Sequence, residues 1–128
     1  MLVGYDGSDS ARRALGRAAE LAERGARVVV LHAARPLYPR PYDISDPDEE
    51  AKSEALLEEA RQLLAARGIE AELRSPTGRA AEALVAAAKE LEADLIVVGR
   101  RGSAVAHMLG SVSSRVVDEA PCDVLVVR

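Results

Sequence analysis

Short runs of aliphatic residues alternate along the chain with longer segments in which apolar residues recur every three or four positions. The short runs are typical of β-strands, and the longer segments are typical of amphipathic helices. The predicted strands span residues 2–5, 27–33, 69–74, 95–98 and 124–127. The predicted helices lie within residues 8–25, 46–68, 79–91 and 110–119. Strands and helices therefore alternate from one end of the sequence to the other.

Residues that favour helix ends support these assignments. Asp46 is a favoured N-cap, and Pro47 fits the first helical position that follows it. Gly25 and Gly68 stand where a left-handed residue commonly ends a helix. The spacing within the second helix predicts that one set of residues lines its buried side: Ala51, Ala55, Leu56, Ala60, Leu63 and Leu64.

The alternation of elements indicates the fold class. Consecutive strands that are joined by helices run parallel, because a helical crossover returns the chain to the same end of the sheet. Right-handed crossovers then place helices on both faces of one open sheet. We expect an α/β fold with an open five-stranded parallel sheet in a single domain, residues 1–128. Ligands of such sheets bind at the carboxyl ends of the strands, where the strand order reverses.

Composition narrows the possible functions. Aromatic residues make up 2% of the chain, which argues against a stacking platform for single-stranded nucleic acid. The net charge of −4 argues against non-specific binding to DNA or to an anionic membrane. No apolar run approaches the roughly 20 residues of a membrane span, and the sequence becomes polar too soon for a signal peptide. We expect a cytoplasmic protein that binds neither nucleic acid nor membrane.

Four side chains are candidates for chemistry: Cys122, His32, His107 and Asp6. Cys122 is the only cysteine, so it forms no internal disulfide, and we expect a buried, inert thiol. His32 ends a predicted strand and is expected to be packed or hydrogen-bonded rather than catalytic. His107 has no acidic neighbour to orient its ring, which argues against a general base. Asp6 leaves two alternatives open, a metal ligand or an acceptor for the amides of its own turn.

The strongest functional pattern is a pair of glycine-containing segments. Residues 99–102 read Gly-Arg-Arg-Gly, and residues 110–113 read Gly-Ser-Val-Ser. Glycines with positive φ can turn backbone amides toward an anion, and the helix that starts at the second segment adds free N–H groups. Its serine hydroxyls can donate to phosphate oxygens, and Arg100 or Arg101 can neutralise charge. The alternative is that the glycines only shape a turn and Ser111 only caps a helix. Strand, loop, glycine–serine pair and helix occur in register, which favours phosphate binding.

The chain resembles the universal stress protein family over nearly all of its length. Residues 4–8, Gly-Tyr-Asp-Gly-Ser, are similar to a turn of that family, and residues 110–112 and 120–127 are similar to its C-terminal signature. The nucleotide-binding branch of the family carries the motif Gly-x2-Gly-x9-Gly-Ser/Thr. Here seven residues, 103–109, separate the second glycine from the third, where the motif has nine.

The resemblance implies a Rossmann-like, adenine nucleotide alpha-hydrolase-like fold with strand order 3-2-1-4-5. It also implies that the motif glycines, together with Ser111, hold the phosphates of ATP. Asp6 would face the ribose, and the backbone around Ala33 and Val98 would meet the adenine. The candidate nucleotide-binding residues are Tyr5, Asp6, Ala33, Val98, Gly99, Arg101, Gly102, Gly110, Ser111, Val112 and Ser113.

We interpret the chain as a universal-stress-like protein that binds ATP or a related nucleotide, ADP or AMP, as a sensor or switch, with or without Mg²⁺ or Mn²⁺. Two alternatives stay open, a nucleotide-free dimeric interaction module of the same family and a slow ATPase. No Gly-x4-Gly-Lys-Ser/Thr motif is present, so the chain is not a P-loop enzyme. The apolar strand 124–127 lies at a sheet edge in the expected strand order. A homodimer paired through this strand is predicted, because an uncovered apolar edge is a liability.

Overall fold

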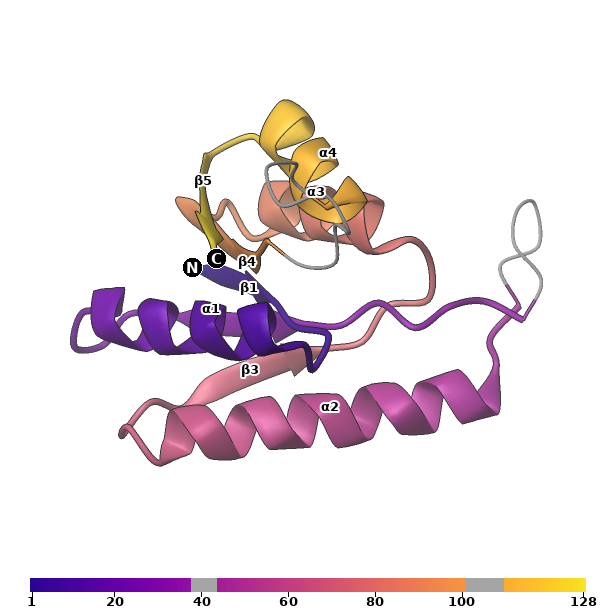
Figure 1. Cartoon of the computed structure of the whole chain (residues 1–128), viewed down its shortest axis with the longest axis horizontal. Coiled ribbons are helices and arrows are strands. Elements are labelled where there is room, and N and C mark those ends of the chain that lie inside the picture. The colour runs from indigo at the N-terminus through magenta and orange to yellow at the C-terminus, as the bar shows by residue number, and fades with distance from the viewer. Residues whose placement is uncertain (38–43, 101–109) are drawn as a thin grey trace.

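Five parallel strands form one sheet in the order β3-β2-β1-β4-β5, as predicted. The computed structural model describes residues 1–37, 44–100 and 110–128. The strands are β1 (Leu2–Gly4), β2 (Val28–Leu31), β3 (Ala71–Arg74), β4 (Leu95–Gly99) and β5 (Asp123–Val127). The helices are α1 (Asp9–Leu21), α2 (Pro47–Ala65), α3 (Ala80–Glu90) and α4 (Ser111–Glu119). Helices α1 and α2 cover one face of the sheet, and α3 and α4 cover the other (Figure 1).

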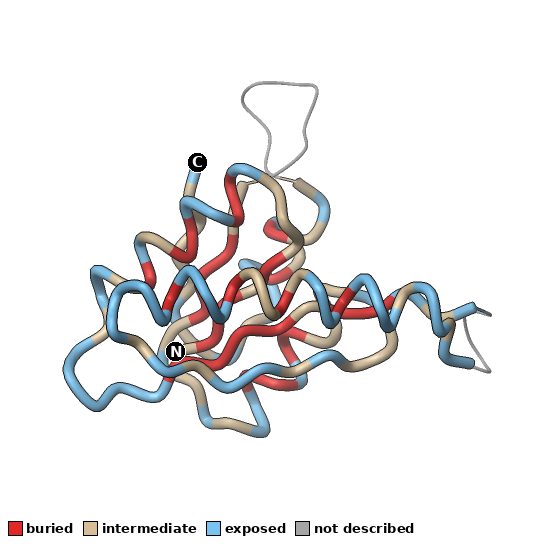
Figure 2. Tube along the Cα trace, turned by 90° about the horizontal axis from the view of Figure 1, so that it is seen from below, coloured by how far each residue is buried: buried red, intermediate tan, exposed pale blue. Residues whose placement is uncertain are grey.

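The central strand β1 is buried on both faces of the sheet. Leu2 and Val3 are 0% exposed, and Leu2 lies opposite Val29 of β2 and Ile96 of β4. Because side chains alternate between the faces of a strand, Leu2 packs in the core beneath α3 and α4, whereas Val3 packs beneath α1 and α2. Figure 2 shows this buried layer running through the centre of the molecule, with the exposed residues on the outer sides of the helices.

The buried face of α2 differs from the predicted one. Its buried residues are Ser53, Leu57, Ala60 and Leu64. Ala51, Ala55 and Leu63, which were predicted to line the buried side, are exposed. The prediction was right for Ala60 and Leu64, and for Leu56, which is partly buried against the same core. It was wrong for the three exposed residues, and it missed Leu57 and Ser53. The Ser53 hydroxyl is hydrogen-bonded to His32 at the end of β2, and this bond makes its burial possible.

Helix ends follow the sequence signals in one case and not in another. Asp46 is the N-cap of α2, as predicted, and its carboxylate accepts a hydrogen bond from the amide of Asp48 at 3.0 Å. Helix α1 ends at Leu21, earlier than predicted. Gly25, with a φ of +83°, lies in the turn that precedes β2 instead of at the helix end.

The two edge strands differ in polarity. On β3, Glu72 accepts two hydrogen bonds from the Arg27 guanidinium, at 2.8 and 2.9 Å, so charged side chains cover this part of the strand. On β5, residues 124–127 are all apolar and only partly buried. An edge of this kind leaves apolar surface and unpaired backbone groups available to a partner.

Gly99 brings the end of β4 against the start of α1. A Cβ atom at this position would lie 2.6 Å from the carbonyl carbon and Oγ of Ser10, and 2.7 Å from the amide nitrogen of Ala11. The expectation of positive φ at the motif glycines is wrong for Gly99, which continues strand β4, and for Gly110, whose φ is −61°. Close packing, and not a left-handed turn, therefore requires glycine at position 99.

This packing yields a prediction for stability. Gly99→Ala should lower the free energy of unfolding by about 1–3 kcal/mol, because the added methyl group overpacks the contact with α1. Gly16→Ala is the matched control. Its Cβ would have as nearest neighbour Arg67 Nη2, 3.8 Å away, so it should stabilise helix α1 by roughly 0.5–1 kcal/mol. Urea unfolding curves measure both changes, and a Gly99→Ala protein as stable as the wild type would contradict the assigned contact.

Candidate functional site

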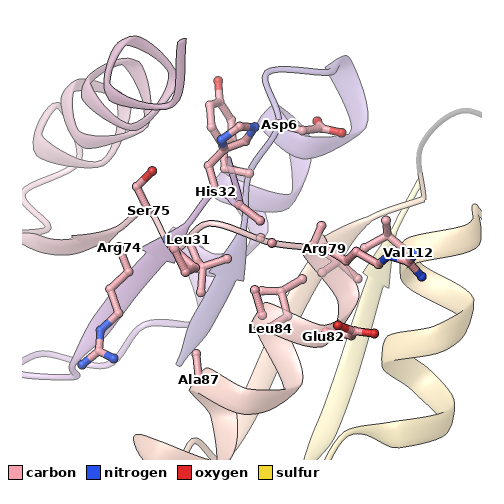
Figure 3. A pocket seen from close by; sticks show the side chains of 18 of the residues that line it. Asp6, Leu31, His32, Arg74, Ser75, Arg79, Glu82, Leu84, Ala87 and Val112 are labelled. Atoms are coloured by element: carbon pink, nitrogen blue, oxygen red, sulfur yellow. The ribbon is translucent and has the colours of Figure 1, made fainter. Parts of the chain in front are cut away.

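A cavity of about 1270 Å³ opens at the carboxyl ends of β1, β2 and β4. Helix α3 runs along one side, and the first turn of α4 closes one end (Figure 3). The order of the sheet reverses between β1 and β4, so the cavity lies at the position where ligands of open parallel sheets bind.

The floor of the cavity is apolar and close to the backbone. Gly4 presents no side chain here, and a Cβ atom at this position would lie 3.1 Å from both Leu84 Cδ1 and Val98 Cγ1. Leu31 and Ala33 continue this surface along the end of β2. The side chains of Leu84 and Val98 therefore fill the space over Gly4 and, with Leu31 and Ala33, form an apolar surface in the cavity.

Asp6 lies in the turn that joins β1 to α1. Its Oδ1 atom accepts a hydrogen bond from the Ser8 amide at 2.9 Å, and Ser8 Oγ in turn accepts one from the Ala11 amide at 3.2 Å. Gly7 between them has a φ of +80°. Of the two alternatives for Asp6, the acceptor for its own turn is therefore observed. Asp6 also lines the cavity.

Tyr5 directs its hydroxyl away from the cavity floor, toward α2. The side chain is 2% exposed and packs with the core beneath α1 and α2. Its hydroxyl donates a hydrogen bond to Glu59, which also accepts one from Arg12 Nε at 2.9 Å. Burial, and next the hydrogen bond to Glu59, raise the pKa of Tyr5 to about 12. This network fixes the β1–α1 turn against α2. Tyr5 also lines the cavity.

His32 stands at the end of β2, on the edge of the cavity. Its Nδ1 atom lies 2.6 Å from Ser53 Oγ, and Ser53 is 0% exposed. The expectation of a hydrogen-bonded histidine is confirmed. Burial lowers the pKa of His32, and the cations Lys52 and Arg35 act in the same direction. The carboxylates of Asp6 and Glu49 oppose this lowering of the pKa.

The first turn of α4 points into the cavity without a side-chain cap. Gly110 is the N-cap residue, and within the described residues the helix has no side-chain cap hydrogen bond. Ser113 Oγ donates to the Gly110 carbonyl at 3.1 Å, so this hydroxyl serves its own helix. Ser111 is exposed at the first helical position and lines the cavity with Val112. Amides at an uncapped helix start are donors suited to an anion.

The structure brings most of the predicted site residues to this one cavity. Those that line it are Tyr5, Asp6, Ala33, Val98, Gly99, Gly110, Ser111, Val112 and Ser113. Arg101, Gly102 and His107 lie outside the described residues.

The wall formed by α3 was not anticipated from the sequence. The turn of residues 75–78, together with Arg79, Glu82 and Leu84, lines the cavity. Thr77 is bridged to Ala34 beyond the ends of β3 and β2, which brings this turn beside the cavity. The expected parallel topology was the one available signal, since it places the loop after β3 at the same edge of the sheet.

Comparison with known proteins identifies the family. A model of the universal stress protein family matches residues 1–128. The chain belongs to this family. A Thermus aquaticus relative named "Universal stress protein in QAH/OAS sulfhydrylase 3′region" is 43% identical over 136 residues, covering 100% of this chain and 97% of the relative.

Two solved structures show the same architecture. A universal stress protein in complex with cAMP has a TM-score of 0.81 and 34% sequence identity, over 99% of this chain and 94% of that one. The universal stress protein from Archaeoglobus fulgidus in complex with dAMP has a TM-score of 0.82 and 27% identity, over 99% and 95% of the two chains.

The described part of this universal stress protein lacks two kinds of feature. No group of three or more His, Cys, Asp or Glu side chains within it could hold a metal ion. No helix within it has the length and apolar character that crossing a membrane requires.

The environment of His32 predicts its titration. The folded state disfavours the imidazolium form, so His32 should titrate below its ordinary pKa of 6.5. Between the folded pKa and 6.5 the unfolded chain binds more protons, so stability falls as the pH falls through this interval. An NMR titration of the His32 ring measures the pKa, with His32→Gln assigning the signal. A midpoint at or above 6.5 would contradict this description.

Proposed function

We propose that this universal stress protein binds an adenine nucleotide, ATP, ADP or AMP, in the cavity at the carboxyl ends of β1, β2 and β4. The observation that carries the proposal is the uncapped first turn of α4, which opens into the cavity. Backbone N–H groups at a helix start bind phosphate, and the helix dipole favours negative charge there. The related structures in complex with cAMP and dAMP support the same class of ligand.

The remaining surfaces of the cavity suit the rest of a nucleotide. The apolar residues Leu31, Leu84 and Val98 offer a surface to a flat base, and Ala33 beside them offers backbone hydrogen-bonding groups. Asp6 also lines the cavity. A carboxylate accepts several hydrogen bonds, so Asp6 can hold its own turn and also accept one from a ribose hydroxyl.

In this proposal the protein acts as a sensor or switch. The phosphate is held by backbone amides of α4, so binding depends on the position of that helix relative to the end of β4. Occupancy of the cavity and the position of α4 are then coupled, and a ligand shifts a protein toward the arrangement that binds it best.

Calorimetric titration with AMP and with ATP tests the proposal. Ser111→Asp places a negative charge at the first turn of α4, where it favours the helix but repels phosphate. We expect at least a tenfold loss of affinity, about 1.4 kcal/mol, with the thermal midpoint retained. Ser114→Asp is the control, because Ser114 is exposed on the same helix but does not line the cavity.

Two results would contradict this proposal. A wild-type protein that binds neither nucleotide at millimolar concentration would refute the function. Equal affinities of wild type and Ser111→Asp would refute the placement of phosphate at α4.

We also propose that two copies pair through β5 into a homodimer. The apolar residues 124–127 on this strand are partly exposed, and β5 forms an edge of the sheet with β4 as its neighbour on one side. Twofold pairing of the two β5 strands would cover both features and stop further growth of the sheet.

Light scattering measures the expected mass, which is twice 13.6 kDa. Val126→Pro should lower this mass by stiffening the strand and removing a donor from the ladder. Leu73→Pro, at the opposite edge of the sheet on β3, should leave it unchanged. A wild-type protein that is monomeric at micromolar concentration would disprove the dimer.

A further inference from the structure

The start of α3 brings a cation to the phosphate end of the cavity. Arg79 is the N-cap residue of α3 and lines the cavity, and its side chain is exposed. Figure 3 shows this side chain extending from α3 toward Val112 in the first turn of α4. The two helices pack against each other, and residues at the starts of both line the same cavity.

The charge of Arg79 is not taken up by the neighbouring carboxylate. Glu82, one turn further along α3, is paired with Arg115 of α4 at 3.3 Å, and Arg115 is paired with Glu119 as well at 3.2 Å. Within residues 1–37, 44–100 and 110–128, Arg79 forms no ion pair.

A second arginine in the same cavity provides a contrast. Arg74 also lines the cavity, but its guanidinium pairs with Glu90 at 3.1 Å. Figure 3 shows Arg74 at the end of β3, on the opposite side of the cavity from Arg79 and Val112. The two arginines therefore differ both in pairing and in distance from the first turn of α4.

We infer that Arg79 pairs with the phosphate of the bound nucleotide and so makes the cavity select phosphorylated over unphosphorylated adenine nucleosides. The inference rests on the proposed function. A guanidinium forms charge-assisted hydrogen bonds to phosphate and can do so in a bidentate way. The amides of α4 approach the same anion from the other side, so two helix starts hold one phosphate between them. An uncharged nucleoside gains nothing from either contact.

The test compares AMP with adenosine on wild type and on Arg79→Gln. Calorimetric or NMR titration of the intact protein gives both affinities. We expect the affinity for AMP to fall about tenfold in the variant, and the affinity for adenosine to change less than twofold. Arg79 is exposed and makes no ion pair with a described residue, so the variant should keep the wild-type thermal midpoint.

Arg74→Gln is the matched control, because it removes the same charge from the same cavity. Arg74→Gln should leave the ratio of the AMP and adenosine affinities within twofold of the wild-type ratio. Arg79→Lys, which keeps the charge, should retain part of the preference for AMP that Arg79→Gln loses. Equal loss of AMP and adenosine binding in Arg79→Gln would overturn the inference, as would an equal effect of Arg74→Gln. A wild type that binds adenosine and AMP equally would also overturn it. A wild type that binds neither would refute the proposed function itself.

Discussion

Burial of β1 on both faces is the constraint on which the rest of the molecule depends. Leu2 and Val3 are completely buried, and the strand is hydrogen-bonded to β2 on one side and to β4 on the other. The first strand of the sequence, β1, lies in the middle of the sheet. Strands β2 and β3 extend the sheet on one side of β1, and β4 and β5 extend it on the other. The chain therefore leaves the ends of β1 and β4 in opposite directions, which opens a cavity between them. A three-residue strand thus determines where a ligand can bind.

The two faces of the sheet contribute differently to this cavity. On the face covered by α1 and α2, Tyr5 and Arg12 are both hydrogen-bonded to Glu59, and His32 is hydrogen-bonded to Ser53. Because Glu59 and Ser53 belong to α2, these bonds hold the ends of β1 and β2 against that helix. On the other face the packing is mainly aliphatic, and the polar contribution comes from the starts of α3 and α4. The cavity is therefore lined by hydrogen-bonded turns on one side and by the starts of α3 and α4 on the other.

The sequence was sufficient for the element order, the strand order and the general place of the cavity, because strand and helix periods are local signals and the family resemblance supplied the topology. Three features could be recognised only in the folded structure. The buried face of α2 was predicted only in part, because the sequence does not show that Ser53 enters the core bonded to His32. Gly99 was expected to turn the backbone, but it makes room for Ser10. Arg79 had no sequence signal, since its position beside α4 follows from the packing of two helices.

The central claim is that an adenine nucleotide occupies the cavity with its phosphate between the starts of α3 and α4. A crystal structure of the wild-type protein with AMP tests it most directly. Phosphate density is expected within hydrogen-bonding distance of the backbone amides of residues 111–113 and of the Arg79 guanidinium, with the base against the apolar surface formed by Leu31, Leu84 and Val98. A nucleotide found at the amino ends of the strands, near Met1 and Asp94, or one whose phosphate points away from α4, would contradict it.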